Sequence, residues 1–456
     1  MPRNEASQYY RYRSLVPRDD SDQNKIGIMQ KDATIAEVNA AFVSSNEAFK
    51  VFSKLSLKHR AQLMRSIAAE IDSLGDELLI VAGKETNLPE ARLRNERART
   101  QFQLTSYAEA CEKGDWLEAR IDTAVPDKNP PKPDIRKMLV PLGPVVVFGA
   151  ANFPFAYSTA GGDTASALAA GCTVIVKAHP AHPGTSELMA KAIHQAVAKN
   201  NLPAGVFIHL HGASFEVGEA LVKHPLTKAV GFTGSLVGGR QLFDWACQRP
   251  EPIPVFAEMS SINPVFLLPG KMKEAAAETA KQYAGSITLG VGQFCTNPGL
   301  LIGIDNDDLK TFTSTLAEEI TKLQPGTMLH AGISKNYAAK KDEALARPAV
   351  QVLAESETIA AENQGAPTIA TVSGADFLKD PLLHREVFGP YSLLIRCKDA
   401  AELNTVAEYL EGQLTCTLMA TTADMAAHAT LVDIVKGRCG RFILNGVPTG
   451  VEVCLS

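Results

Sequence analysis

The chain has 456 residues, of which 45% are hydrophobic and 21% charged, as is usual for folded globular proteins. At roughly 100–200 residues per domain, this length predicts two or three domains. The formal net charge of -5 gives no basic excess, so neither nucleic acid nor a membrane surface is an expected partner. No stretch approaches the roughly 20 apolar residues of a membrane span, and no apolar leader follows the N-terminal charges.

The eight cysteines are scattered without the paired spacing of a disulfide scaffold or a zinc site. We therefore expect free thiols and a reducing compartment, the cytoplasm. Two pairs of histidines occur, His179 with His182 and His209 with His211, but neither pair has a third ligand at useful spacing. No metal site is expected.

Apolar residues three and four apart predict helices across residues 34–110. The proline-rich run 126–134 cannot continue a helix and indicates a connector, followed by a short strand near 136–140. From residue 143 the pattern changes to strands at 144–148, 173–177, 205–210, 228–231 and 254–257, alternating with helices at 157–170, 185–199, 215–223 and 236–247.

This alternation predicts a parallel, doubly wound sheet, on which ligands bind beyond the carboxyl ends of the strands. Asn152, Lys177, Gly231 and Glu258 all fall at or just after such ends. The alternation continues less clearly in the second half, with helices near 274–285, 307–323 and 399–411 and strands near 300–304, 392–396 and 414–420.

Cys295 follows a flexible Gly292 and precedes the turn Thr-Asn-Pro-Gly, which predicts a loop. As a nucleophile it needs thiolate character, and its target carbonyl needs a donor for the developing oxyanion. Its own amide and the side chain of Asn152 are the candidate donors. Glu258, between an apolar strand and a mostly uncharged stretch, is the candidate general base. The plainer alternatives are an incidental cysteine, a turn-forming asparagine and a surface glutamate.

A dinucleotide could lie near Lys177, which ends an apolar strand, and near the turn from Gly231 through Thr233 and Gly234 to Ser235, which begins a helix. Helix N-termini bind pyrophosphates. The first strand–helix unit lacks the GxGxxG fingerprint, so this hypothesis rests on position alone.

Together these residues resemble the aldehyde dehydrogenase superfamily from about residue 30 to 450. The strongest blocks are 143–184, 228–264, 290–299 and 385–390, the last reading Arg-Glu-Val-Phe-Gly-Pro. The stretches 161–171, 177–185, 249–254 and 292–298 resemble the branch of α-ketoglutaric semialdehyde (2,5-dioxopentanoate) dehydrogenases, which itself resembles a bacterial NADP-dependent fatty aldehyde dehydrogenase.

The resemblance implies that Cys295 attacks the aldehyde, that Asn152 and the Cys295 amide hold the oxyanion, and that Glu258 activates the water that hydrolyses the thioester. Hydride passes to the nicotinamide. The cofactor-binding residues implied in this way are Lys177 and His179 after the second strand, Gly231, Thr233, Gly234 and Ser235 in the glycine turn, and Glu386 and Phe388 beside the nicotinamide ribose.

Many NAD-using relatives carry an acidic residue three positions after the ribose lysine, where this chain has Pro180. Without that carboxylate a 2′-phosphate meets less repulsion, so we expect NADP as cofactor, with NAD possible. A second departure is Ser260, where the family usually has a glycine that gives the Glu258 loop its freedom.

The resemblance also implies an α/β fold with a doubly wound cofactor domain, an α/β catalytic domain and a small bridging element for a homodimer or homotetramer. The expected boundaries are 1–127 with 143–258 for the dinucleotide-binding domain, 259–450 for the catalytic domain and 128–142 for the bridging segment. The family normally continues past residues 445–454, so we expect the C-terminal part of the bridging element to be missing.

The expected reaction is oxidation of 2,5-dioxopentanoate to 2-oxoglutarate, with Arg120 as a candidate cation for the substrate carboxylate. Three alternatives stay open: a medium- or long-chain fatty aldehyde as substrate, a catalytically inactive truncated relative, and a cofactor-free cysteine acyl-transfer enzyme. The last needs a histidine base, which the Cys295 block lacks.

Overall fold

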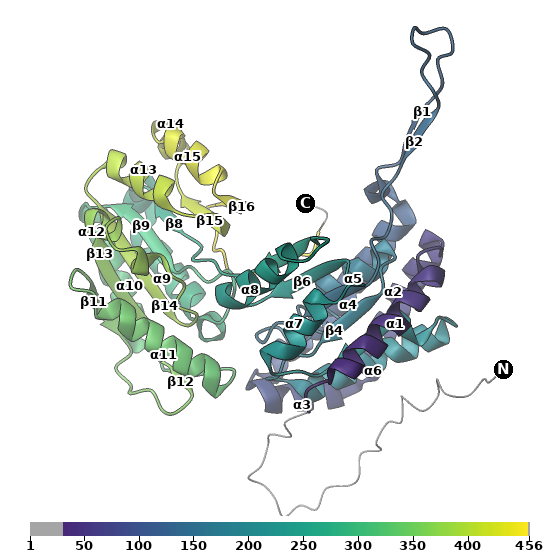
Figure 1. The fold of residues 1–456 in the computed structure, drawn as a ribbon. Helices are drawn as coiled ribbons and strands as arrows, with labels where there is room; N and C mark the ends of the chain where they lie inside the picture. Colours follow the sequence, from purple (N-terminus) through teal and green to yellow (C-terminus); the bar gives the residue numbers. More distant parts are fainter. Residues whose placement is uncertain (1–30, 455–456) are drawn as a thin grey trace, which may run out of the picture.

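The computed structural model describes residues 31–454 and contains two α/β lobes, each built on its own sheet (Figure 1). The part of the expected first domain that falls within residues 1–30 lies outside the described residues. Among the described helices, none is both long and apolar enough to cross a membrane.

The sheet of the first lobe has five parallel strands in the order β5-β4-β3-β6-β7. The strand of this sheet that comes first in the chain, β3, is central, and later strands are added on either side, so the order reverses between β3 and β6. The strands are β3 (Val145–Phe148), β4 (Val174–Lys177), β5 (Phe207–Leu210), β6 (Ala229–Thr233) and β7 (Val255–Glu258).

Helices cover both faces of this sheet, because successive strand residues point to opposite sides. Val145 and Val147 pack into one core with α2 to α6, whereas Val146 and Phe148 pack into another with α1, α7 and α8. The helices are α1 (Ile35–Phe52), α2 (Leu57–Ser73), α3 (Gly75–Thr86), α4 (Glu90–Lys113), α5 (Gly162–Ala170), α6 (Pro183–Lys199), α7 (Phe215–Lys223) and α8 (Leu236–Cys247).

The second lobe has a seven-stranded sheet in the order β11-β13-β14-β9-β8-β15-β16, parallel except for the edge strand β11. Helices α9 and α10 cover one face, and the remaining helices pack mainly on the other. The strands are β8 (Val265–Leu267), β9 (Leu300–Ile304), β11 (Gln351–Glu355), β13 (Thr368–Ser373), β14 (Tyr391–Cys397), β15 (Gln413–Met419) and β16 (Cys439–Leu444). The helices are α9 (Pro269–Thr288), α10 (Asp307–Lys322), α11 (Ala331–Leu345), α12 (Gly374–Phe377), α13 (Ala400–Tyr409), α14 (Thr422–Ala427) and α15 (Ala429–Lys436). A small pair, β10 (Gly326–Thr327) and β12 (Gln364–Gly365), completes this lobe.

An exposed hairpin of β1 (Arg120–Asp122) and β2 (Ile135–Lys137) projects away from the first lobe (Figure 1). The hairpin begins at Arg120, upstream of the segment 128–142 that the sequence predicts as the bridge. The sequence also predicts a strand at 136–140, but pairing with β1 ends at Lys137.

The expected helix at 157–170 begins only at Gly162. The residues before it form turns, in which the Phe155 and Ala156 amides donate to the Glu96 carboxylate and the Ala150 amide to the Tyr157 carbonyl oxygen. These turn residues therefore bond to Glu96 on α4 and do not form the first turn of a helix. The chain at 150–161 folds back toward the end of β3.

Candidate active site

Cys295 lies in a turn that is held from both sides by backbone and side-chain contacts. The Nδ2 of Asn263 donates to the carbonyl oxygens of Cys295 (2.8 Å) and Asn297 (2.9 Å). Gly292 has a φ of +64°, and a Cβ there would lie 2.3 Å from the carbonyl carbon of Gly389. Only glycine fits this approach, so the nucleophile candidate sits on a closely supported loop.

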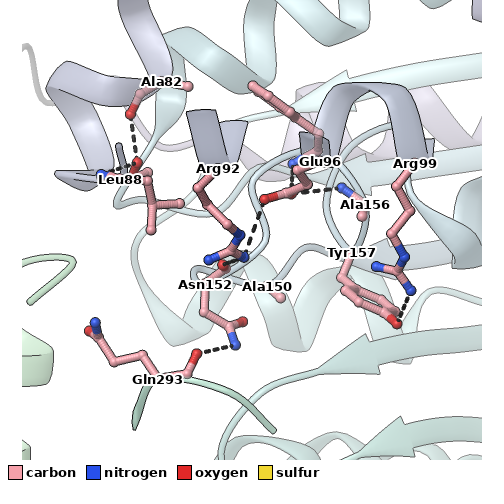
Figure 2. A network of polar contacts seen from close by, with 12 residues as sticks. Ala82, Leu88, Arg92, Glu96, Arg99, Ala150, Asn152, Ala156, Tyr157 and Gln293 are labelled. Carbon is pink, nitrogen blue, oxygen red and sulfur yellow. Dashed lines mark hydrogen bonds and ion pairs between the residues drawn. The ribbon is translucent and has the colours of Figure 1, made fainter. Parts of the chain in front are cut away.

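Asn152 lies beside this loop, in the turn after β3 (Figure 2). Its Nδ2 donates to the carbonyl oxygen of Gln293 at 3.0 Å, two residues before Cys295. The rings that follow Asn152 and precede Cys295, Phe153 and Phe294, meet edge to face with centroids 5.4 Å apart. The structure therefore brings the two sequence-predicted loops together.

Arg92 and Glu96, one turn apart on α4, contact the Asn152 turn and support it (Figure 2). Arg92 Nη2 donates to the carbonyl oxygen of Asn152 at 3.2 Å, and its guanidinium lies over the rings of Phe153 and Phe294. Glu96 is buried, pairs with Arg92 at 3.4 Å and accepts the two backbone amides described above. Burial raises the pKa of Glu96, while Arg92 opposes that rise.

Glu258 ends β7 and lies near the thiol of Cys295. Burial, followed by the nearby Glu258 carboxylate, raises the pKa of Cys295 well above its ordinary value. The thiol is therefore protonated, and Glu258 is placed to take its proton. The backbone amide of Cys295 also lies beside its own sulfur.

Glu386 is a second carboxylate near the thiol. Ser260 Oγ donates to its Oε2 at 3.2 Å, and Lys340 Nζ donates to its backbone oxygen at 3.2 Å. Burial raises the pKa of Glu386 to about 7. Asp163 on α5 has its pKa raised to about 6 by burial and then by Glu258. Phe388, half-buried, lies two residues after Glu386.

Lys177 ends β4, and its Nζ donates to the backbone oxygens of Ala178 and Gly212. Burial lowers the pKa of Lys177 to about 8. His179 follows it, accepts the Ala181 amide at 3.1 Å and stacks on His182. Burial lowers the pKa of His179 well below its ordinary value, so its ring is neutral.

The turn from Gly231 to Ser235 joins β6 to α8 at the same edge of the sheet. Ser235 caps α8 by accepting the Gly238 amide at 3.2 Å, and the Gly234 amide donates to the backbone oxygen of Glu258 at 2.9 Å. Gly234 and Ser235 are exposed, and Thr233 is half-buried. A Cβ at Gly231 would approach the Asp163 carboxylate to 3.0 Å.

These features fit a dinucleotide. An exposed helix N-terminus after β6 suits a pyrophosphate, and a lysine stands at the end of β4. These two strands lie on either side of β3, where the strand order reverses. This edge also carries Asn152 and Glu258.

Arg120 is not brought to this site. It lies on β1, which is exposed along its whole length and belongs to the projecting hairpin (Figure 1). A role for Arg120 in binding substrate has no support within one copy of the chain. The sequence interpretation missed Arg92, Glu96 and Asn263. The first two share one face of α4, so helical spacing was the signal available for them.

A half-buried thiol beside a carboxylate, an amide on the adjoining loop and a dinucleotide-type sheet edge fit a dinucleotide-dependent oxidoreductase. The chain belongs to the aldehyde dehydrogenase family, whose sequence model matches residues 11–453. Its reaction class is therefore the NAD(P)-dependent oxidation of an aldehyde.

Two curated relatives cover most of the chain. An alpha-ketoglutaric semialdehyde dehydrogenase 2 of Azospirillum brasilense is 48% identical over 423 residues, covering 92% of this chain and 81% of the relative. An alpha-ketoglutaric semialdehyde dehydrogenase of Acinetobacter baylyi is 41% identical over 435 residues, covering 95% and 82%. The resemblance to this branch is confirmed.

Solved structures share the fold. A 1-pyrroline-5-carboxylate dehydrogenase from Thermus with bound NAD aligns with a TM-score of 0.77 at 22% identity, covering 92% of this chain and 79% of that one. A glyceraldehyde-3-phosphate dehydrogenase from Methanocaldococcus jannaschii complexed with NADP aligns with a TM-score of 0.75 at 19% identity, covering 93% and 88%. The predicted α/β fold class is confirmed.

Proposed function

We propose that this enzyme oxidises 2,5-dioxopentanoate to 2-oxoglutarate. The observation that carries the proposal is the Glu258 carboxylate beside the thiol of Cys295, in a chain 48% identical to an alpha-ketoglutaric semialdehyde dehydrogenase.

In the proposed reaction, Cys295 Sγ bonds to the aldehyde carbon while its proton passes to Glu258. The carbonyl oxygen becomes an oxyanion, which accepts the second N–H of Asn152 and the backbone N–H of Cys295. A bound oxidised nicotinamide would supply the hydride acceptor, and loss of hydride from that carbon would leave a thioester on Cys295.

Glu258 then releases the thiol proton to solvent and removes a proton from water as it adds to the thioester. The carbon–sulfur bond breaks, the acid leaves as its carboxylate, and the thiol is restored. Glu258 thus acts as base in both halves of the cycle.

We propose that the cofactor is held by residues of the first lobe and by one loop of the second. Lys177 binds the adenosine ribose, with His179 shaping the turn that follows, and the segment Gly231, Thr233, Gly234 and Ser235 binds the pyrophosphate. Glu386 accepts hydrogen bonds from the nicotinamide ribose, and Phe388 packs beside it.

We further propose that NADP is preferred over NAD. Pro180 is exposed in the turn after Lys177 and brings no carboxylate to the 2′-position of that ribose. Because residue 180 carries no negative charge, it does not repel a phosphate on the 2′-oxygen of that ribose, and this favours NADP over NAD.

The domain roles follow from the same assignment. We propose a dinucleotide-binding first lobe, a catalytic second lobe beginning at residue 259, and a bridging hairpin between copies in a homodimer or homotetramer. Four apolar side chains just after β2 are at least 43% exposed: Met138, Leu139, Val140 and Leu142. Such exposure is expected in a single copy if this segment forms an interface with a second copy. Light scattering of a Leu139→Asp, Val140→Asp variant tests this, and an unchanged mass would refute the hairpin as the bridge. All eight cysteines are free, which supports a cytoplasmic location.

The test of the function is a panel of aldehydes assayed with both cofactors at the nicotinamide absorbance. We expect kcat/KM to be highest for 2,5-dioxopentanoate, above pentanal and decanal. A higher value for decanal would overturn the substrate in favour of a fatty aldehyde. Acyl transfer without added dinucleotide would overturn the mechanism.

A further inference from the structure

One arginine beside the candidate active site forms no direct ion pair among residues 31–454, although its charge interacts with the buried Glu96 carboxylate. Arg99 lies on α4, half-buried, and within the described residues it forms no ion pair within 4 Å. Its Nε is shielded from solvent and has no hydrogen-bond partner among those same residues. Two other arginines of this helix are paired, Arg92 with Glu96 and Arg94 with Glu90 and Asp76.

The contact that Arg99 does make points toward the reacting groups. Its Nη2 donates to the hydroxyl of Tyr157 at 2.8 Å, and its guanidinium lies 4.9 Å from the centroid of that ring (Figure 2). Tyr157 lies within electrostatic range of Cys295 and Glu258. The phenol accepts from Arg99, so its own proton stays available to another acceptor.

A row of aromatic rings joins this arginine to the nucleophile. Tyr157 meets Phe153 edge to face at 5.2 Å, and Phe153 meets Phe294 in the same way at 5.4 Å. Phe153 follows Asn152 and Phe294 precedes Cys295, so one end of the row is beside the reacting carbonyl. The other end is Tyr157 with Arg99. Arg92 lies over one side of Phe153 and Phe294, and Arg99 lies at the far end of the row. The remaining apolar surface of the rings, with the Arg99 cation at its far end, matches a short aliphatic chain bearing an aldehyde at one end and a carboxylate at the other.

We propose that Arg99, together with the Tyr157 hydroxyl, binds the substrate carboxylate, while the carbon chain lies along Phe153 and Phe294. The inference rests on the proposed function and names the residue that selects anionic semialdehydes over neutral aldehydes. A partly desolvated guanidinium gains most from an anion that it can meet through two N–H groups. It takes the place that the sequence interpretation gave to Arg120.

The test compares Arg99→Gln with the wild-type enzyme on 2,5-dioxopentanoate and on pentanal, which has the same carbon count and no carboxylate. Loss of a charged hydrogen bond predicts a rise in KM for the anionic substrate on the order of 10- to 100-fold. We expect kcat on that substrate, and both constants for pentanal, to stay within about threefold. Arg94→Gln, on the exposed side of the same helix, is the matched control and should change neither substrate.

Inhibition of pentanal oxidation by glutarate gives a second readout, independent of chemistry at the aldehyde. Glutarate should inhibit the wild-type enzyme and inhibit Arg99→Gln at least tenfold more weakly, with Arg99→Lys in between. If Arg99→Gln fails to fold, Arg99→Lys and Tyr157→Phe make the same comparison, and both should weaken glutarate inhibition without changing pentanal turnover.

Equal losses for both substrates would mean that Arg99 only supports the fold, and unchanged constants would mean that the carboxylate binds elsewhere. Either result overturns the inference while leaving the proposed function intact, provided the wild-type enzyme prefers 2,5-dioxopentanoate. A wild-type enzyme that treats 2,5-dioxopentanoate and pentanal alike would instead overturn the proposed substrate.

Discussion

The side-chain amide of Asn152 donates to the backbone oxygen of Gln293 at 3.0 Å, so the turn after β3 is tied directly to the loop of Cys295. This bond uses one of the two N–H groups of the amide and fixes its plane. In the proposed mechanism the other N–H binds the oxyanion, and this bond orients it before any substrate arrives. Preorganised donors of this kind supply large shares of catalytic rate enhancement.

Replacing Asn152 with alanine should therefore lower kcat by roughly 100- to 1000-fold, with a smaller effect on KM, because the donor acts mainly on the oxyanion. Asn95→Ala, at an exposed position of α4, is the control and should leave kcat unchanged. Steady-state kinetics with saturating cofactor measure both variants. A loss below tenfold at Asn152 would assign the oxyanion to other donors.

Glu96→Ala should destabilise the protein by about 3–5 kcal/mol, since it leaves the buried part of Arg92 without its counter-charge. It also removes the acceptor of two backbone amides. Urea unfolding at neutral pH measures the free energy of unfolding. The exposed Glu90 forms a comparable pair with Arg94, yet Glu90→Ala should cost less than about 1 kcal/mol. Similar values for the two variants would contradict the role given to Glu96.

Cofactor binding should weaken as the pH falls through about 7. Burial raises the pKa of Glu386 to about 7, so this carboxyl is neutral below that pH and ionised above it. Only the ionised form offers both oxygens to ribose hydroxyls. The dissociation constant for NADP should therefore rise between pH 8 and pH 6, as measured by fluorescence titration. Glu386→Gln should bind weakly at both values, and a variant that keeps the wild-type pH profile would rule out Glu386 as the titrating group.

Pro180→Glu should shift cofactor choice toward NAD. A carboxylate in the turn after Lys177 would repel a 2′-phosphate and accept hydrogen bonds from a 2′-hydroxyl, so kcat/KM for NADP should fall about tenfold. The value for NAD should hold or rise. Pro252→Glu adds the same charge at another exposed site and should leave the ratio unchanged. If the NADP value does not move, the 2′-position lies away from residue 180.

Many helices and strands of the first lobe can be predicted from the local pattern of apolar and polar residues. Helices α7 (Phe215–Lys223) and α8 (Leu236–Cys247) match the expected ranges, because in each the apolar residues at helical spacing end where polar residues begin. Strand β9 (Leu300–Ile304) also matches. Strand β8 has only three residues after Pro264 and carries too little pattern to stand out. The alternation of strands and helices also placed Asn152, Lys177 and Glu258 at one sheet edge.

What the sequence could not supply depends on contacts between distant segments. The expected helix at 157–170 begins only at Gly162, and turns precede it, because Glu96, more than fifty residues earlier, accepts the Phe155 and Ala156 amides. Arg99 looks like any solvated arginine in the sequence, and its significance for the inference comes from having no ion pair among residues 31–454. Arg120 looks equally suitable in the sequence, but in the fold its strand lies on an exposed hairpin.

The approach of Gly292 to Gly389 has a practical consequence for redesign. Backbone meets backbone there, so the nucleophile loop and the Glu386 loop cannot be varied one at a time without disturbing each other. Helix α4 is under no such restriction, because its contribution to the site comes from side chains alone. A library aimed at new aldehydes should therefore diversify α4 except at Arg92 and Glu96, which support the Asn152 turn, and leave the two glycine loops untouched.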